Sequence, residues 1–206
     1  SAALRQLTDL ELEIPCLDLL CDIGKGHRQE EHLEELRRCL DSAAELRIPY
    51  LRLRASGAPD APAEADEPVR AFLEAALPLA EEAGVVLLVE TYGLYADSAR
   101  LRALLNRFAR DSLAALWDIQ HTCRSAGETP ETTITNLGAY VRHVHVKDSK
   151  VVDGQPVYCL MGEGTLPIAD MMDALRSVNY SGFVSLEWDP LWFEALGDPD
   201  IIFPQF

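Results

Sequence analysis

The sequence lacks any apolar run long enough to cross a membrane, and it has few basic residues for its length. No stretch approaches the roughly 18 apolar residues that a membrane-spanning helix needs, and the first residues lack the layout of a signal peptide. The 206 residues include 18 Lys and Arg against 34 Asp and Glu, which gives a formal net charge of −16. Because nucleic-acid binding draws on clustered basic residues, we expect neither a nucleic acid nor a membrane as a partner.

Cysteine is scarce, and its spacing shows no pairing. The five cysteines are scattered without a Cys-x-x-Cys motif, at Cys16, Cys21, Cys39, Cys123 and Cys159. An odd number without paired spacing indicates neither a disulfide framework nor a zinc ribbon. This usage is typical of a reducing compartment, and we expect a cytoplasmic protein.

Short apolar runs alternate with amphipathic stretches, a pattern typical of βα units on a parallel sheet. The predicted strands are 14–20, 50–54, 85–90, 113–118, 140–148 and 182–188. The predicted helices are 30–46, 67–83, 96–110, 133–137 and 167–178. The sequence therefore predicts about six βα units in a single α/β domain, residues 1–206.

Six units leave two architectures open. A TIM (β/α)8 barrel of eight units usually takes about 250 residues, and this chain is shorter. Either the sheet is an open doubly wound one, or the first two strands of a barrel lie outside these residues. No closing helix is evident after residue 188. We expect an incomplete TIM barrel that is truncated or part of a longer chain.

Ionisable residues stand near the carboxyl ends of four consecutive predicted strands, where parallel α/β proteins place their sites. They are Glu90, Asp118, His145 and Glu187. Alternate strand residues share a face, so His143, His145 and Lys147 point to one side while Val144 and Val146 point to the other. Three carboxylates and an imidazole suit a divalent ion such as Mn²⁺ or Mg²⁺, with Co²⁺ or Zn²⁺ as alternatives.

Each of these residues also has an ordinary interpretation. A single carboxylate at a strand end is more often a helix N-cap or a loop residue, and a single inward histidine is more often a hydrogen-bonded core residue. Four such residues at the ends of successive strands make a metal site more plausible, because a barrel interior does not tolerate three carboxylates without a compensating cation. On spacing alone, the metal site and the ordinary interpretation both stay open.

Five ordered motifs resemble those of the xylose isomerase-like TIM-barrel superfamily. They are VETYG, WDIQH, HVHVKD, the GEG within residues 161–165, and VSLEW. The superfamily includes sugar phosphate isomerases, ketose 3-epimerases, inosose isomerases and dehydratases, and zinc AP endonucleases. The resemblance is strong from Leu46 to the C-terminus and weak before it.

The resemblance implies roles for individual residues. Glu90, Asp118, His145 and Glu187 match the four metal ligands, with Mn²⁺ as the favoured ion. His121 matches a substrate-binding histidine. In the epimerase branch the two glutamates also exchange protons with the sugar from opposite faces. The implied activity is a metal-dependent isomerase or epimerase of a sugar, sugar phosphate or inosose, acting by proton abstraction next to a carbonyl.

Several neighbouring residues carry open assignments. Lys147 either donates to the substrate or forms a salt bridge with Asp148 or Glu187. Arg52 or Arg54 either approaches the site, with Arg52 expected to bind the substrate, or covers apolar atoms at the surface. His143 is expected to support a ligand.

Three residues at the edges of these motifs have weaker assignments. Trp188 and Trp192 either wall the pocket or pack in the ordinary way. Asp148 has the opposite strand parity and is predicted to be a loop or helix-capping residue.

Two other functions remain as alternatives. One is a non-catalytic or regulatory metal-binding barrel domain of a larger protein, since pocket-forming strands are missing. The other is an AP endonuclease-like phosphodiesterase, which the acidic composition and the small number of histidines disfavour. The expected partner is a small-molecule carbohydrate, and the chain could form a homo-oligomer.

Overall fold

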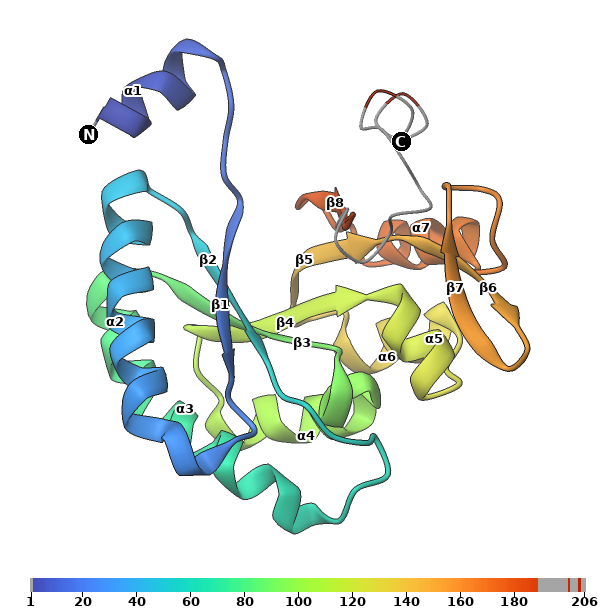
Figure 1. The fold of residues 1–206 in the computed structure, drawn as a ribbon, viewed down its shortest axis with the longest axis horizontal. Coiled ribbons are helices and arrows are strands. Elements are labelled where there is room, and N and C mark those ends of the chain that lie inside the picture. The colour runs from blue at the N-terminus through green and yellow to red at the C-terminus, as the bar shows by residue number, and fades with distance from the viewer. Residues whose placement is uncertain (1, 189–199, 201–203, 205–206) are drawn as a thin grey trace.

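The protein is described by a computed structural model that covers residues 2–188, 200 and 204. Within this part of the chain, six parallel strands form one curved sheet in the order β1-β2-β3-β4-β5-β8 (Figure 1). They are β1 (Cys16–Asp22), β2 (Tyr50–Arg54), β3 (Val86–Glu90), β4 (Leu113–Asp118), β5 (Val141–Val146) and β8 (Val184–Leu186). Each overlaps one of the six predicted runs, so the strand prediction is confirmed.

The helices alternate with these strands along the chain. They are α1 (Ala2–Asp9), α2 (Gln29–Leu46), α3 (Glu67–Ala83), α4 (Ser98–Phe108), α5 (Ile119–Ser125), α6 (Pro130–Leu137) and α7 (Ile168–Ser177). Pro130 opens α6, and Gly84 ends α3 with a φ of +68°. The sequence did not predict α1 or α5. None of the helices in the described residues has both the length and the apolar character to span a membrane.

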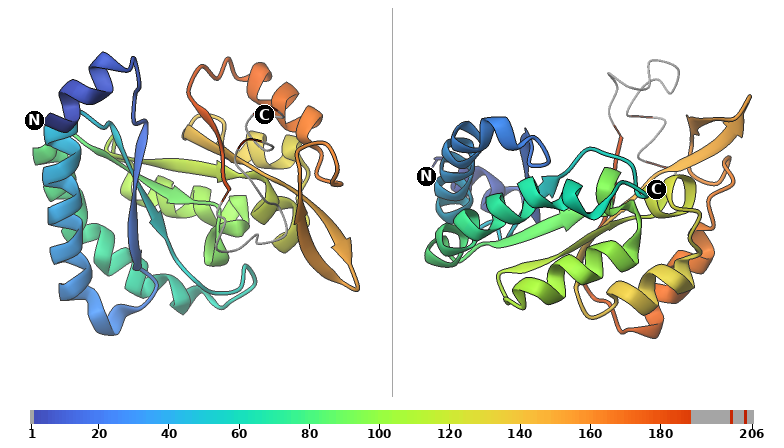
Figure 2. Two further views of the ribbon diagram at one scale, coloured as in Figure 1. Left: turned by 45° about the horizontal axis from the view of Figure 1, so that its top comes forward. Right: turned by 90° about the horizontal axis from the view of Figure 1, so that it is seen from below.

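The helices cover the outer face of the sheet, with α2 against α3, α4 against α6, and α6 against α7 (Figures 1 and 2). Strand alternation gives the two faces different side chains. Leu87 and Val89 of β3 belong to the large apolar cluster shared with the helices. Leu88, Ala114 and Leu116 form a separate small cluster on the inner face. The inner face therefore has its own apolar floor, and the polar groups lie nearer the carboxyl ends of the strands.

Within the described residues, the sheet does not close into a complete barrel. Strands β1 and β8 form its edges, and within the described residues neither has a second strand beside it. A cavity of about 540 Å³ lies between these edges and is lined by residues of both strands. Six parallel strands on an open curved sheet confirm the prediction of an incomplete TIM barrel.

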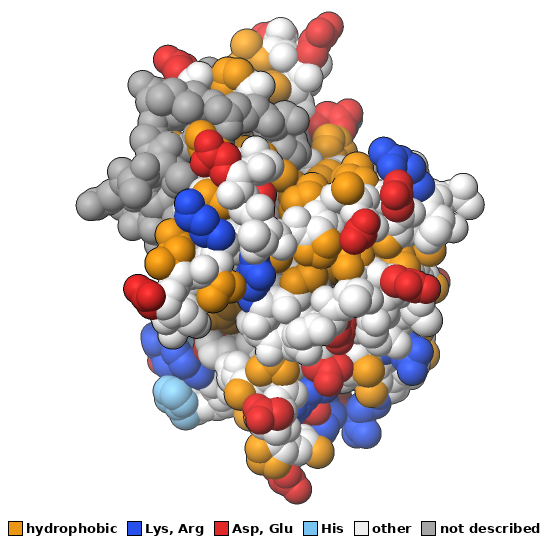
Figure 3. Space-filling model, turned by 90° about the vertical axis from the view of Figure 1, so that its right-hand side faces the viewer, with side chains coloured by type: hydrophobic (Ala, Val, Ile, Leu, Met, Phe, Trp, Pro, Cys, Tyr) orange, Lys and Arg blue, Asp and Glu red, His pale blue; other side chains and the backbone are white. Residues whose placement is uncertain are grey.

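A two-stranded antiparallel hairpin, which the sequence did not predict, follows β5. It consists of β6 (Asp148–Val152) and β7 (Gln155–Cys159). Its turn residues Asp153 and Gly154 have φ values of +49° and +76°, as a type I′ turn requires. Figure 3 views the molecule from this side, where apolar side chains reach the surface. The Asp-Gly dipeptide was the signal for this hairpin, but it lies outside the regular βα alternation.

Candidate metal centre

The four side chains predicted as ligands meet at the carboxyl edge of the sheet. Glu90 ends β3, Asp118 ends β4, His145 lies near the end of β5, and Glu187 follows β8. One ligand atom from each of these residues lies within 4.8 Å of the others. Neighbouring strands of the sheet thus deliver one candidate ligand each, at or just after the carboxyl end of the strand, where the sequence predicted these residues.

The register of the parallel strands sets these side chains at matching heights. Asp118 stands opposite His145 across the β4–β5 pair, and His145 stands opposite Ser185 across the β5–β8 pair. The amide N of Glu187 then donates a hydrogen bond to the carbonyl O of Val146 at 2.9 Å. Backbone pairing therefore brings the ends of three strands together before any side chain contributes.

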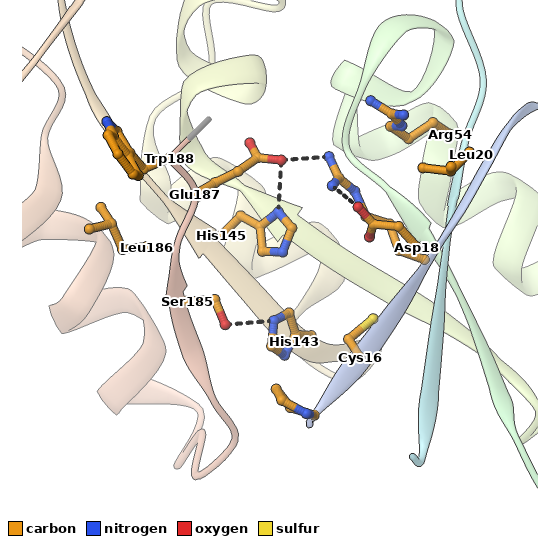
Figure 4. Close-up of a pocket in the computed structure, with 12 residues that line it drawn as sticks. Cys16, Asp18, Leu20, Arg54, His143, His145, Ser185, Leu186, Glu187 and Trp188 are labelled. Atoms are coloured by element: carbon orange, nitrogen blue, oxygen red, sulfur yellow. Dashed lines mark hydrogen bonds and ion pairs between the residues drawn. The ribbon is translucent and has the colours of Figure 1, made fainter. Parts of the chain in front are cut away.

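Arg52 of β2 supplies one positive charge to this cluster. Its Nε donates to Oε2 of Glu90 at 2.9 Å and its Nη2 to Oε1 of Glu90 at 2.8 Å. The same Nη2 lies 2.8 Å from Oε1 of Glu187, and Nη1 donates to Oδ2 of Asp18 at 3.0 Å. Arg52 is only 5% exposed, which excludes the surface interpretation. Figure 4 shows two of its partners, Asp18 on one wall of the cavity and Glu187 on the other.

Lys147 supplies a second positive charge. Its Nζ lies 2.5 Å from Oδ2 of Asp118 and also forms an ion pair with Glu187. The salt bridge predicted with Glu187 is present, and Asp118 rather than Asp148 is the second partner. Because Glu90 and Asp118 are fully buried, these two cations offset carboxylate charge that would otherwise be costly to bury.

Asp118 has a structural role beside its place in the cluster. Its Oδ1 accepts a hydrogen bond from the amide N of Gln120 at 2.8 Å and so caps α5. The N-cap interpretation and the ligand interpretation therefore both fit Asp118, since its two oxygens face different partners.

His145 lies between the two glutamates. Its Nδ1 is 3.6 Å from Oε1 of Glu90 and 3.6 Å from Oε1 of Glu187, which is an ion-pair distance rather than a hydrogen-bond distance. Burial alone would lower the pKa of His145, but the two carboxylates raise it to about 9. Burial would raise the pKa of Glu187, and His145, Lys147 and Arg52 lower it. The glutamates are thus held as carboxylates.

His121 and His143, the other two histidines with predicted roles, contact different members of the cluster. His121 of α5 places Nε2 3.7 Å from Oδ2 of Asp118, and its ring packs edge-on against Tyr92. His143 is 1% exposed, and its Nε2 lies 3.0 Å from Oγ of Ser185. The ring of His143 contacts the ring of His145 edge-on at a centroid distance of 5.3 Å, in agreement with a supporting role.

Asp148 is not a loop or helix-capping residue, so that prediction is wrong. It begins β6 and is 3% exposed. Its carboxylate accepts hydrogen bonds from the backbone amides of Ser149, Gly162, Gly164 and Leu166. The carboxylate therefore organises the GEG loop beside the hairpin, and the parity of the strand gave no hint of it.

The hairpin also contacts α5, the helix that carries His121. Nε2 of Gln120 donates to the hydroxyl of Tyr158 at 2.7 Å. Nη2 of Arg124 donates to the carbonyl O of Ser149 and to Oγ1 of Thr165, each at 2.7 Å. The side chains of α5 thus connect the metal centre to the hairpin and the GEG loop.

The cavity between β1 and β8 opens directly onto the cluster (Figure 4). Arg54 and Trp188 line this cavity, in agreement with the interpretations that placed Arg54 at the site and Trp188 in the pocket wall. Trp192 lies outside the described residues. Asp18 also lines the cavity and binds Arg52, but the sequence patterns did not predict it as a site residue. The signal for it was an acidic residue inside the apolar run IPCLDLL.

The donor set fits a divalent ion. Two ligands on opposite sides of an ion, each about 2.0–2.4 Å from it, lie about 4.0–4.8 Å apart, and the four ligand atoms here fall within 4.8 Å of one another. Nδ1 of His145 has no hydrogen-bond partner in the described structure, although it is buried. A cation between the carboxylates would replace the proton that they favour on His145, and Nδ1 would then bind the cation through its lone pair.

The profile of the family described as "Xylose isomerase-like TIM barrel" matches residues 1–198. The chain belongs to this family. None of the curated proteins compared with it is a significant match.

Solved structures of the same fold differ widely from it in sequence. A D-tagatose 3-epimerase-like protein is 18% identical with a TM-score of 0.75, over 89% of this chain and 73% of the other. The apo 3-keto-D-glucoside 4-epimerase YcjR from E. coli is 19% identical with a TM-score of 0.74, over 92% and 78%. The IOLI protein, solved with a zinc atom, is 17% identical with a TM-score of 0.76, over 99% and 83%. At this identity the likeness concerns the fold.

Proposed function

We propose that the protein is a divalent-metal-dependent sugar isomerase or epimerase that moves a proton on carbon next to a carbonyl. The observation that carries this proposal is the pair Glu90 and Glu187, whose Oε1 atoms both lie 3.6 Å from Nδ1 of His145. Two carboxylates at one ion suit reversible proton transfer: one, in its ionised form, accepts the proton from carbon, and the other returns a proton to carbon after taking one up from solvent. The family assignment supports the same chemistry.

The proposed ligands are Glu90, Asp118, His145 and Glu187, with Mn²⁺ as the first choice and Mg²⁺, Co²⁺ or Zn²⁺ as alternatives. When bound, the ion would supply positive charge beside the substrate oxygens and so stabilise the negative charge left by proton removal.

The remaining roles belong to residues of the chain itself. Glu90 and Glu187 take up and return the proton. His121, 16% exposed at its side chain and next to Asp118, is placed to hydrogen-bond a substrate hydroxyl. Lys147 holds the carboxylates of Asp118 and Glu187, and its ammonium group would donate to a substrate oxygen at that end of the centre.

The proposal includes the partner and the compartment. The substrate class is a small carbohydrate, and the names of the epimerases of similar fold make ketoses the first compounds to test. The strongly acidic composition speaks against a nucleic acid. All five cysteines are free thiols, which fits the cytoplasm.

One observation favours a second candidate, a non-catalytic or regulatory metal-binding domain. The cavity lies between two strand edges that have no further partner in the described residues, so its wall is incomplete. A domain of this kind would bind the ion without turning over a sugar.

Deuterium exchange separates the two candidates. The protein is incubated in D₂O with Mn²⁺ and a panel of ketoses and inososes, and the sugars are analysed by NMR and mass spectrometry. We expect deuterium on carbon next to the carbonyl, no exchange with Glu187→Gln, and normal exchange with Glu163→Gln, which changes an exposed glutamate of the GEG loop. Metal binding without exchange into any sugar would favour the non-catalytic domain.

A further inference from the structure

We propose that Arg52 is a positioning residue, which sets the orientation of Glu90 and Glu187 for the metal ion instead of binding the substrate. This inference rests on the proposed metal centre, although it does not depend on which sugar is converted.

The contacts of Arg52 leave its guanidinium committed to the protein. Nε and Nη2 hold both oxygens of Glu90 in a fork, at 2.9 Å and 2.8 Å. Nη2 also lies 2.8 Å from Glu187, and Nη1 donates to Asp18 at 3.0 Å. Each of the three nitrogens thus contacts a carboxylate of the chain. A substrate that bound Nε or Nη2 would have to break the buried ion pair with Glu90.

Glu187 depends on side-chain contacts for its orientation more than Glu90 does. It follows β8, a strand of three residues that lies at the edge of the sheet and pairs with β5. Its side chain is 15% exposed, whereas that of Glu90 is fully buried. The backbone hydrogen bond from Glu187 to Val146 fixes where the residue starts but not where its carboxylate points. Side-chain contacts must therefore do so.

Arg52 connects the two edges of the sheet at this height. Asp18 belongs to β1 and Glu187 follows β8, and no strand lies between these edges in the described residues. The chain of contacts from Asp18 through Arg52 to Glu187 spans the cavity where backbone pairing does not. Arg52 is therefore a polar link that holds Glu187, at the β8 edge, to Glu90 of β3 and to Asp18 of the β1 edge.

The shape of the guanidinium matters as well as its charge. Its planar fork binds both oxygens of one carboxylate and fixes their plane, while a lysine ammonium is a point charge that does not. If Arg52 only neutralised charge, Arg52→Lys would preserve the centre. If it sets geometry, the same substitution disturbs the centre although the charge is kept.

The experiment measures Mn²⁺ affinity by isothermal titration calorimetry, with folding checked by circular dichroism. We expect Arg52→Lys to weaken Mn²⁺ binding about 10- to 100-fold, the usual effect of losing a residue that orients a metal ligand. Arg54→Lys is the matched control, because Arg54 lies on the same face of β2 and lines the same cavity without contacting the four ligands. We expect its Mn²⁺ affinity to equal that of the unmodified protein.

A second variant covers the case in which Arg52→Lys does not fold. Asp18→Asn removes the outer partner of Arg52 at a side chain that is 44% exposed, so the fold tolerates it. Because that ion pair is half exposed, we expect Mn²⁺ binding to weaken about two- to fivefold. The inference is overturned if Arg52→Lys folds and binds Mn²⁺ normally, or if Arg52→Lys fails to fold and Asp18→Asn binds normally.

Activity distinguishes this inference from the proposed function. If an Arg52→Lys enzyme kept its Mn²⁺ affinity and kcat but showed a raised KM, Arg52 would be a substrate contact and the inference would be wrong. If the unmodified protein bound Mn²⁺ and exchanged no sugar, the proposed function would fail while the metal titrations still decided the role of Arg52. An unmodified protein that bound none of Mn²⁺, Mg²⁺, Co²⁺ and Zn²⁺ would overturn both.

Discussion

Nζ of Lys147 lies 2.5 Å from Oδ2 of Asp118, a residue that solvent does not reach. The ammonium group also contacts Glu187, so a single lysine serves two of the four proposed metal ligands. Burying these carboxylates is tolerable only because the cation is buried with them.

Replacing Lys147 tests this charge balance. We expect Lys147→Met to lower the free energy of unfolding of the metal-free protein by about 3–5 kcal/mol, because it leaves buried carboxylates without their partner. Urea denaturation with a chelator present measures the loss, and saturating Mn²⁺ should restore part of it. Lys150→Met, at an exposed position of the hairpin, should change the same quantity by less than about 0.5 kcal/mol. Equal effects of the two substitutions would show that the buried pair contributes nothing.

The GEG loop depends on a glycine that leaves room for a carboxylate. A Cβ at Gly164 would lie 1.9 Å from Oδ1 of Asp148, whereas a Cβ at Gly162 would meet nothing within 4 Å. We expect Gly164→Ala to cost about 2–4 kcal/mol of stability through overpacking and lost hydrogen bonds. Gly162→Ala should cost only about 1 kcal/mol, from its φ of +86°. Thermal unfolding of both variants makes the comparison, and a harmless Gly164→Ala would mean that Asp148 does not hold the loop.

Acid sensitivity is expected at His32 of α2, far along the chain from the metal centre. His32 is 5% exposed, and burial lowers its pKa below the usual 6.5. Above pH 6.5, His32 is neutral in both the folded and the unfolded protein, so its titration does not affect stability there. As the pH falls below about 6.5, the unfolded chain takes up a proton that the folded protein resists, so stability decreases.

His32→Gln should therefore reduce the loss of stability on acidification. The free energy of unfolding is measured in urea at about pH 7.5 and about pH 5.5, on either side of the ordinary histidine pKa. His27→Gln serves as the control, since His27 is exposed. If the pH dependence of His32→Gln matched that of the unmodified protein, the burial of His32 would not be its cause.

Much of the architecture could be predicted from periodicity. The run LAALWD became β4 with every residue buried, because an apolar strand covered on both faces needs no alternation. The same reasoning placed Glu90, Asp118 and His145 at strand ends, where parallel pairing brings them together. Local pattern was sufficient here, since each of these three residues belongs to a regular strand.

The parts that were missed depend on contacts between distant segments. Asp148 looked like a loop residue because its four amide donors lie up to 18 residues further along the chain. Arg52 and Arg54 share one face of β2, so parity could not tell that Arg52 alone reaches Glu90. The hairpin β6–β7 escaped because its exposed valines, such as Val151 and Val157, follow no core-facing pattern.

The most direct test of the account is equilibrium dialysis of the unmodified protein and of His145→Ala against Mn²⁺, with bound metal measured by atomic spectroscopy. His145 is suited to this test because its substitution removes a ligand without removing a carboxylate charge. The account predicts a single tightly bound ion per chain in the unmodified protein and a loss of tight binding in His145→Ala. Equal Mn²⁺ binding by the two proteins would contradict the proposed centre.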